Sequence, residues 1–259
     1  MNIRKLFKAA GWLFSPDPWK RRRIRQEAAR IAASLFGDFP ISEDHKLWRE
    51  DRKFFADYRR LTPNSYSEDR KYTLRELVRF TCDLDGDMAE CGCFEGATAW
   101  FMADECPGTP LHLFDSFEGL SEPDRNDKPE GDELFEWAKG DLSASEEKVR
   151  RNLAGFDNVS YYKGWIPTRF DDVADRRFRF VHLDVDLYQP TLDSLEFFYP
   201  RMVEGGVILL DDYGFTSCPG AKKATDEFFA SRPEHVLHLP TGQGFAIKLA
   251  ESTPHRPAN

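Results

Sequence analysis

After residue 87, apolar positions alternate between short continuous runs and sets at helical spacing. A short apolar run of strand length is typical of a parallel strand that is covered on both faces. The runs that we interpret as strands are 88–91, 111–114, 159–163, 178–185 and 206–210. The helical sets between them are 97–104, 143–155, 189–199 and 221–230. This alternation predicts an α/β fold built on a parallel sheet.

The two ends of the chain depart from this alternation. Near the C-terminus, 236–239 and 244–249 flank Pro240-Thr241-Gly242-Gln243 and predict a hairpin. A mostly parallel, seven-stranded sheet that ends in an antiparallel hairpin is unlike the ordinary dinucleotide-binding fold. Near the N-terminus, further helices are predicted before the sheet begins, at 26–36, 54–61 and 74–80.

Carboxylates end two of the predicted strands. Asp184 and Asp186 end one strand, and Asp211 and Asp212 end the next. Because a helix connects the strands, they run parallel and their ends meet at one edge of the sheet, where ligands bind. Repelling carboxylates at one edge favour a hard cation such as Mg²⁺. The alternative is structural, with Asp184 and Asp186 capping the following helix and the other two in a turn.

A second site signal is the glycine turn between the first strand and its helix, with Gly92, Cys93 and Gly96. Cys93 stands where a dinucleotide-binding fingerprint has its middle glycine, so the motif alone is weak. Glu90 at the strand tip would repel a pyrophosphate but suits a ligand with an ammonium and a sulfonium group. This pattern favours S-adenosylmethionine over NAD.

The following strands offer further candidates for that ligand. Asp115 and Ser116 end the second strand, where an acid can accept hydrogen bonds from both ribose hydroxyls. Gly164 and Trp165 end the third, and the indole either flanks an adenine ring or belongs to the core. His182 lies on a strand and is interpreted as a satisfied structural histidine, outside the chemistry.

The stretch 117–140 is long, polar and acidic, and it follows the second strand. A loop of this length at the carboxyl edge of a sheet is typical of a lid or binding loop. The alternative is a disordered insertion.

The length and composition suit one catalytic domain. With 259 residues and 41% hydrophobic content the chain can bury an ample core. We expect a basic arm and helical cap over 1–70, the catalytic domain over 71–250 and a tail over 251–259. We also expect a homo-oligomer.

Charge is unevenly distributed along the chain. The formal charge is −9, but residues 1–25 carry +7 and the remainder −16. So acidic a body argues against nucleic acid as a partner. Two interpretations of the basic arm stay open. It either makes a weak contact with an anionic membrane surface, or it is a solvated or partner-packed arm. Its apolar run at 9–14 is too short to span a bilayer or to act as a signal peptide, so we expect a cytoplasmic protein.

The five cysteines are odd in number and contain no C-x-x-C pair. This pattern favours free thiols in a reducing compartment over a disulfide framework. We interpret Cys91 and Cys93, inside the glycine loop, as small residues that fit there.

The combined motifs resemble the macrocin O-methyltransferase family of antibiotic-sugar methyltransferases. The segments that carry the resemblance are AECGCFEGATAW, LHLFDSFEGL, HLDVDLYQPTLDSLEFFYPRM, GGVILLDDYG and GAKKATDEF. The resemblance covers residues 74–249 and implies a class I methyltransferase Rossmann-like fold. It also implies binding of S-adenosylmethionine and a requirement for Mg²⁺.

The resemblance also implies roles for single residues. Asp184 in LDVDLY is the implied metal ligand and general base, and Asp211 and Asp212 in LLDDY are the implied remaining ligands. Asp186 is the next candidate for the base. Val185 stands where glycine is common in the family, so the local backbone is expected to differ.

We therefore expect an Mg²⁺-dependent O-methyltransferase that acts on a hydroxyl of a glycosylated small molecule or glycan precursor. One rival is a metal-dependent hydrolase built on the aspartates, which leaves Glu90 and Asp115 unexplained. Another is a non-catalytic protein that only binds S-adenosylmethionine.

Overall fold

The computed structural model describes residues 46–250 except 64, 66 and 130–135, together with Ala28, Ile31, Ala32 and Leu35, which are helical. The predicted arm 1–25, the rest of the helix 26–36 and the tail 251–259 lie outside the described residues. Backbone proximity divides the chain into two compact units, Met1–Asp57 and Tyr58–Asn259. The predicted domain boundary at 70/71 stays a prediction.

Seven strands form one sheet in the described part of the second unit, in the order β3-β2-β1-β4-β5-β7-β6. They are β1 (Asp87–Cys91), β2 (Leu111–Asp115), β3 (Val159–Lys163), β4 (Phe178–Leu183), β5 (Met202–Leu210), β6 (Leu237–His238) and β7 (Gly244–Ile247). Strands β1 to β5 pair in parallel, whereas β7 pairs antiparallel with both β5 and β6. The predicted mostly parallel sheet with a terminal antiparallel hairpin is confirmed.

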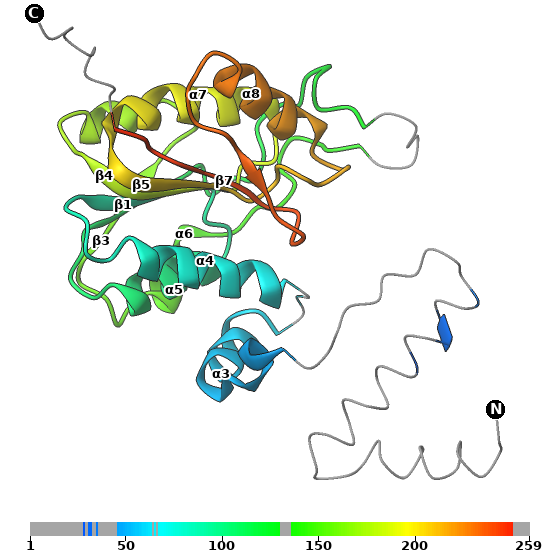
Figure 1. The fold of residues 1–259 in the computed structure, drawn as a ribbon, viewed down its shortest axis with the longest axis vertical. Helices are drawn as coiled ribbons and strands as arrows, with labels where there is room; N and C mark the ends of the chain where they lie inside the picture. The colour runs from blue at the N-terminus through cyan, green and yellow to red at the C-terminus, as the bar shows by residue number, and fades with distance from the viewer. Residues whose placement is uncertain are drawn as a thin grey trace, which may run out of the picture. The chain divides into compact units, whose positions relative to one another are not determined.

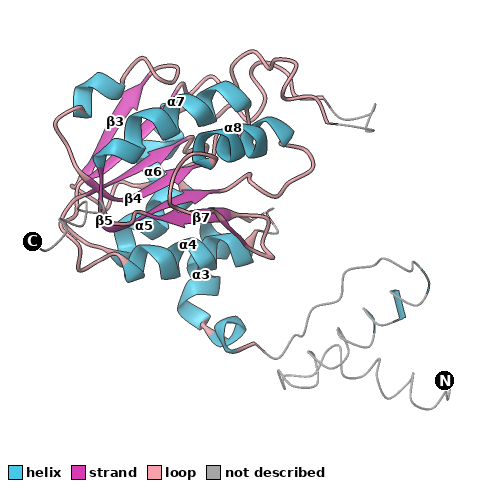
Figure 2. Ribbon diagram, turned by 45° about the horizontal axis from the view of Figure 1, so that its top comes forward, coloured by secondary structure: helices cyan, strands magenta, loops and turns pink. Residues whose placement is uncertain are grey.

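Helices cover both faces of the sheet, with α7 and α8 on one face and α4 and α5 on the other (Figures 1 and 2). The helices of the described part are α3 (Arg52–Leu61), α4 (Glu68–Phe80), α5 (Ala97–Glu105), α6 (Glu146–Asn152), α7 (Tyr188–Phe198) and α8 (Pro219–Phe229), with 3-10 turns η1 (Leu47–Glu50), η2 (Phe170–Val173) and η3 (Tyr199–Arg201). Because both faces are covered, every residue of β4 is buried. No helix among the described residues is long and apolar enough to cross a membrane.

Helix α4 begins earlier than the apolar spacing predicts. The spacing indicates a start at Leu74, but the helix begins at Glu68, after Ser67 in the N-cap position. Acidic residues in the first turn favour the positive end of the helix dipole, and this part of α4 is polar because it lines a pocket. The early start places Arg70 and Lys71 on the helix.

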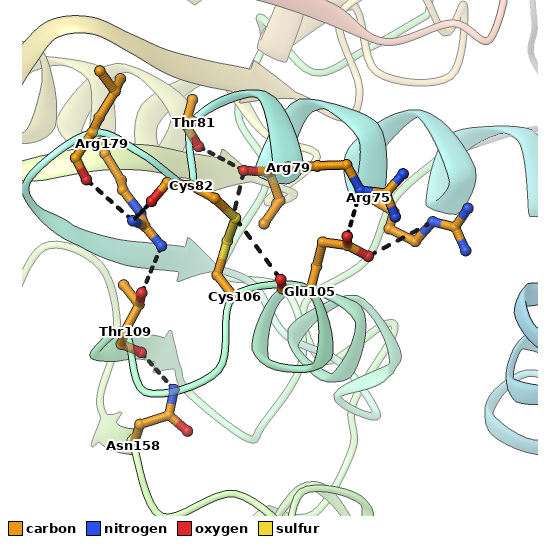
Figure 3. The surroundings of a disulfide bond; sticks show 11 residues. Arg75, Arg79, Thr81, Cys82, Glu105, Cys106, Thr109, Asn158 and Arg179 are labelled. Atoms are coloured by element: carbon orange, nitrogen blue, oxygen red, sulfur yellow. Dashed lines mark hydrogen bonds and ion pairs between the residues drawn. A yellow bond between two sulfur atoms is a disulfide. The ribbon is translucent and has the colours of Figure 1, made fainter.

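The prediction of free thiols throughout is wrong for one pair, since a disulfide joins Cys82 to Cys106 (Figure 3). Cys82 lies just after α4 and Cys106 caps the end of α5, and their Cα atoms are 6.1 Å apart. The residues are 24 positions apart in sequence and meet because α4 and α5 pack side by side. Cys spacing alone does not contain this packing. The other three cysteines are free and buried.

Candidate active site

The carboxyl ends of the central parallel strands form the site. Gly92 follows β1, Asp115 ends β2, Asp184 follows β4 and Asp211 follows β5. Strand β1 lies between β2 and β4, so the chain winds outward from it in both directions. Ligands of open α/β sheets bind in the crevice at such a switch point.

A first hollow, here called the strand-tip pocket, has a volume of about 810 Å³. Six of the predicted site residues line it, namely Gly92, Asp115, Ser116, Gly164, Trp165 and Asp184. The structure therefore brings together the ends of β1, β2, β3 and β4 in one pocket.

Asp115 organises the glycine turn. One oxygen of its carboxylate accepts hydrogen bonds from the backbone N–H groups of Cys93 (2.8 Å) and Phe94 (3.2 Å). The other oxygen accepts from the backbone N–H of Phe117 at 2.7 Å. Asp115 thus holds the turn after β1 against the end of β2, in addition to facing the pocket.

Gly92 is required by a close backbone approach. Its φ is +78°, and a Cβ added there would lie 1.9 Å from the carbonyl oxygen of Asp184. No larger residue fits without moving the segment after β4, because backbone atoms form the obstacle. The glycine turn and the first carboxylate are therefore packed directly against each other.

Three of the residues predicted to bind the donor lie off the wall of the strand-tip pocket. Glu90 is fully buried, and one oxygen of its carboxylate has no hydrogen-bond partner among the described residues. Gly96 precedes α5 with φ +80° and faces Val149. Cys93 lines a second hollow.

The second hollow, here called the α4 pocket, is larger, at about 1520 Å³. It is lined by polar and aromatic side chains that include Arg70, Lys71, Lys148, Trp137, Phe215 and Asp212. It shares four lining residues with the strand-tip pocket, namely Phe94, Leu142, Asp184 and Asp186. The two pockets therefore meet at two carboxylates.

The border between the pockets has an unusual backbone. Phe94 (φ 44°), Leu142 (φ 58°) and Asp186 (φ 60°) all adopt left-handed conformations there. Such conformations are uncommon for residues other than glycine and are retained mainly at functional sites. The structure holds the border residues in positions that local preference alone disfavours.

The predicted lid loop is anchored on both sides of the undescribed residues 130–135. Asp127 accepts hydrogen bonds from the backbone N–H groups of Tyr188 (2.7 Å) and Asp124 (2.8 Å). The indole N–H of Trp137 donates to the carbonyl oxygen of Ser217 at 2.9 Å. The described parts of the loop are thus held by hydrogen bonds to the residues around α7 and α8, and the role of the loop as a lid stays a prediction.

His182 connects two of the site carboxylates. Its Nδ1 lies 2.9 Å from Glu90 and its Nε2 lies 3.3 Å from Asp211, and all three side chains are almost fully buried. The histidine is satisfied, as predicted, but both partners belong to the site. The sequence signal was the position of His182 two residues before Asp184 on the same strand.

The predicted aspartates form two neighbouring groups rather than one triad. Ligand atoms of Asp184, Asp211 and His182 lie within 4.8 Å of one another, as do those of Asp186, Asp212 and Cys218. The backbone N–H of Asp186 donates to Asp212 at 2.9 Å and joins the two strand ends.

Burial and mutual repulsion raise the pKa values of three of these acids. Burial, followed by the charge of Asp211, raises the pKa of Asp184 to about 6. Burial, followed by Asp184, raises the pKa of Asp186 to about 7. The pKa of Asp212 is also raised well above its ordinary value, by burial and then by Asp186 and Asp184. Near neutral pH Asp184 and Asp186 can therefore exchange protons.

Asp211 behaves in the opposite way. Burial alone would raise its pKa, but Lys71, His182 and Arg70 hold the pKa below its ordinary value. Burial by itself would lower the pKa of His182, but hydrogen bonds with Asp211 and Glu90 raise that pKa to about 9. At neutral pH the imidazole is a cation that donates from both nitrogens.

The charges of this group do not balance. The carboxylates are Glu90, Asp184, Asp186, Asp211 and Asp212, and the facing cations are Arg70, Lys71 and His182. With all eight ionised, two negative charges are in excess. One divalent cation would neutralise them.

The family assignment follows from sequence comparison. The family model of Macrocin-O-methyltransferase (TylF) matches residues 41–240, which is most of the chain. The chain belongs to this family. The match contains all the motifs on which the predicted resemblance rests. It also includes α3 and α4.

Two characterised relatives are similar to part of the chain. Demethyldecarbamoylnovobiocin O-methyltransferase of Streptomyces niveus is 31% identical over 160 residues, 57% of this chain and 60% of the relative. A tetracenomycin-C 4'-O-methyltransferase of Streptomyces olivaceus, named for a dimethoxy-rhamnosyl compound, is 30% identical over 148 residues, 53% of this chain and 57% of the relative. The chain thus spans about 60% of the length of these curated relatives.

Solved structures share the macrocin O-methyltransferase fold. The O-methyltransferase NovP has a TM-score of 0.56 at 23% identity and covers 70% of this chain and 80% of its own. The calicheamicin methyltransferase CalS11 has a TM-score of 0.60 at 15% identity and covers 90% and 94%. These likenesses confirm the predicted class I methyltransferase fold.

Proposed function

We propose that the protein transfers a methyl group from S-adenosylmethionine to a hydroxyl of a small glycosylated molecule. The observation that carries this proposal is the meeting of two pockets at Asp184 and Asp186. A methyl transfer needs a donor and an acceptor in separate sites that meet at the reacting atoms. The strand-tip pocket suits the donor and the α4 pocket the acceptor.

The donor site rests on residues at the strand tips. Asp115, Ser116, Gly164 and Trp165 line the strand-tip pocket. The first two are proposed to bind the ribose hydroxyls, and the last two to flank the adenine. Glu90 lies deeper, and its unpaired buried oxygen suits the positive charge of the donor.

The carboxylates fit a divalent cation, for which we propose Mg²⁺ held by Asp184 and Asp211 of the first group, with Asp212 of the neighbouring group as the third ligand. Asp184 faces both pockets, and no described residue donates a hydrogen bond to its carboxylate. Asp212 uses one oxygen for the Asp186 backbone, which leaves the other. An all-oxygen set suits Mg²⁺, and the ion when bound would lower the pKa of an acceptor hydroxyl.

Asp184 is the proposed general base, with Asp186 as the next candidate. The hydroxyl proton passes to the carboxylate while the C–O bond forms and the S–C bond of the donor breaks, which leaves S-adenosylhomocysteine. A carboxylate whose pKa is raised to about 6, or to about 7 for Asp186, is well matched to proton transfer near neutral pH.

The proposed acceptor class draws on the relatives. Both relatives described above act, by their names, on natural products, and one name gives a rhamnosyl compound. The α4 pocket has room for a sugar-bearing molecule. Its wall offers hydroxyl, cationic and aromatic side chains. A cytoplasmic location and self-association stay predictions from the sequence.

Methyl transfer from labelled S-adenosylmethionine to a panel of nucleotide sugars, glycosylated natural products and lipid-linked glycans tests the proposal. We expect transfer that requires Mg²⁺ and stops with chelator. Thermal denaturation with S-adenosylhomocysteine serves as the binding control. Donor binding without transfer to any acceptor would favour a binding protein, and absence of donor binding would contradict the proposal.

A further inference from the structure

Asp211 is surrounded by hydrogen-bond donors. Its Oδ1 accepts from Gln243 Nε2 at 2.7 Å and from His182 Nε2 at 3.3 Å. Its Oδ2 forms an ion pair with the guanidinium of Arg70. The Asp211 side chain is 1% exposed, so its carboxylate has almost no direct contact with solvent.

Oδ1 already accepts two hydrogen bonds, so a metal ion ligated by Asp211 would bind Oδ2, where it would be repelled by the guanidinium of Arg70. His182 lies in β4 and Gln243 directly precedes β7, and both side chains are 0% exposed. Arg70 differs, since its side chain is 26% exposed, lines the α4 pocket and lies with its guanidinium 5.0 Å from the centre of the Phe215 ring. Of the three donors, Arg70 is the one that can leave without opening the core.

We propose that Arg70 and the divalent cation compete for Asp211, so that the metal enters by displacing the guanidinium from the Oδ2 atom. The inference rests on the metal site proposed above. Arg70 is then a positioning residue that holds Asp211 ionised and oriented, and yields one oxygen on metal binding. The displaced guanidinium stays within the α4 pocket, beside the acceptor.

Lys71 provides a matched comparison. It is the next residue on α4, lines the same pocket, is 8% exposed, and its charge also lowers the pKa of Asp211. Among the described residues it donates no hydrogen bond to Asp211. A variant of Lys71 therefore removes the same unit of charge without removing a competing bond.

The experiment is calorimetric titration of Mg²⁺ into the unaltered protein, Arg70→Gln and Lys71→Gln. We expect Arg70→Gln to bind Mg²⁺ about ten-fold more tightly, the change expected when a charged hydrogen bond no longer competes. We expect a smaller gain for Lys71→Gln than for Arg70→Gln, because it removes a nearby positive charge without freeing an oxygen of Asp211.

Two other outcomes overturn the inference in different ways. Equal or weaker binding by Arg70→Gln than by Lys71→Gln would show that Arg70 does not compete, with the metal site itself intact. No Mg²⁺ binding by any of the three proteins would remove the proposed metal site as well.

A second measurement uses the unaltered protein and does not depend on the stability of Arg70→Gln. The Nε–Hε resonance of Arg70, assigned by its absence from the spectrum of Arg70→Lys, reports on the guanidinium whose Nη1 pairs with Asp211. We expect it to move when Mg²⁺ is added. A resonance unchanged at saturating Mg²⁺ would overturn the exchange.

Discussion

Glu90 and Asp211 are held by opposite nitrogens of one imidazole, that of His182. The three residues lie at the ends of β1, β4 and β5, so a single buried cation connects the end of the proposed donor strand to the proposed metal site. Buried carboxylates without such a partner are strongly destabilising. The imidazole therefore stabilises the arrangement on which both pockets depend.

Replacement of His182 tests this role. We expect His182→Gln to lower the free energy of unfolding by about 3 kcal/mol, because it leaves two buried carboxylates poorly paired. Urea unfolding measures the loss. His112→Gln is the control, since His112 is also buried between two partners, Asp87 and Tyr162, away from the site. Only His182→Gln is expected to weaken binding of S-adenosylhomocysteine as well.

The pH dependence of stability carries a signature of the same residue. The pKa of His182 is raised from 6.5 to about 9 in the folded protein, so its charge stabilises fully below pH 6.5. That contribution is lost as pH rises through 9. The raised pKa values of Asp184 and Asp186 change the unfolding free energy at lower pH, up to about pH 7. Between pH 7 and 9 the unfolding free energy should fall in the unaltered protein and change less in His182→Gln.

Asp115 is expected to control donor affinity. Asp115→Asn should weaken binding of S-adenosylhomocysteine by about 1.5 to 3 kcal/mol, because an amide replaces a charged acceptor of hydrogen bonds. The same change weakens the bonds that hold Cys93 and Phe94, so a small loss of stability accompanies it. Calorimetry measures the affinity. Asp193→Asn, on the α7 side of the same pocket, is the control and should bind S-adenosylhomocysteine normally. Unchanged affinity in Asp115→Asn would show that Asp115 does not bind the ribose.

The roles of Asp184 and Asp211 can be separated by metal rescue. Asp211→Asn should raise the Mg²⁺ concentration needed for turnover and recover in excess Mg²⁺. Asp184→Asn should not recover, because an amide can offer an oxygen to a metal but cannot take a proton, and loss of a general base lowers rates about a hundred-fold to ten-thousand-fold. Turnover against Mg²⁺ concentration is the measurement. If turnover of Asp184→Asn recovers in excess Mg²⁺ and turnover of Asp186→Asn does not, the general base is Asp186.

The disulfide between Cys82 and Cys106 should stabilise the packing of α4 on α5. Closing a loop between residues 24 positions apart is worth about 3 kcal/mol in the chain-entropy account. Reduction with dithiothreitol should therefore lower the melting temperature of the unaltered protein. The double variant Cys82→Ser/Cys106→Ser should melt at the lower temperature with or without reductant. A reductant effect of the same size in both proteins would contradict a role for this disulfide.

The fold and most residues of the proposed site could be predicted from local patterns in the sequence. Apolar runs and helical spacing are local patterns, and they specify which segments become strands and helices. Parallel strands joined by helices must end at one edge, so Asp115, Asp184 and Asp211 were bound to lie near one another. The family match and the structural likenesses confirm the predicted fold, whereas the roles of the site residues stay predictions.

How those side chains pair follows from tertiary packing and could not be predicted from the sequence. The bridge made by His182, the ion pair of Arg70 with Asp211 and the disulfide all join residues far apart in sequence, and each depends on distances of a few ångströms. Hydrophobic periodicity has no information about such distances, because it reports which face is buried and not which polar atoms meet. Helix α4 is the clearest case: its polar first turn lines a pocket, and apolar spacing therefore placed its start too late.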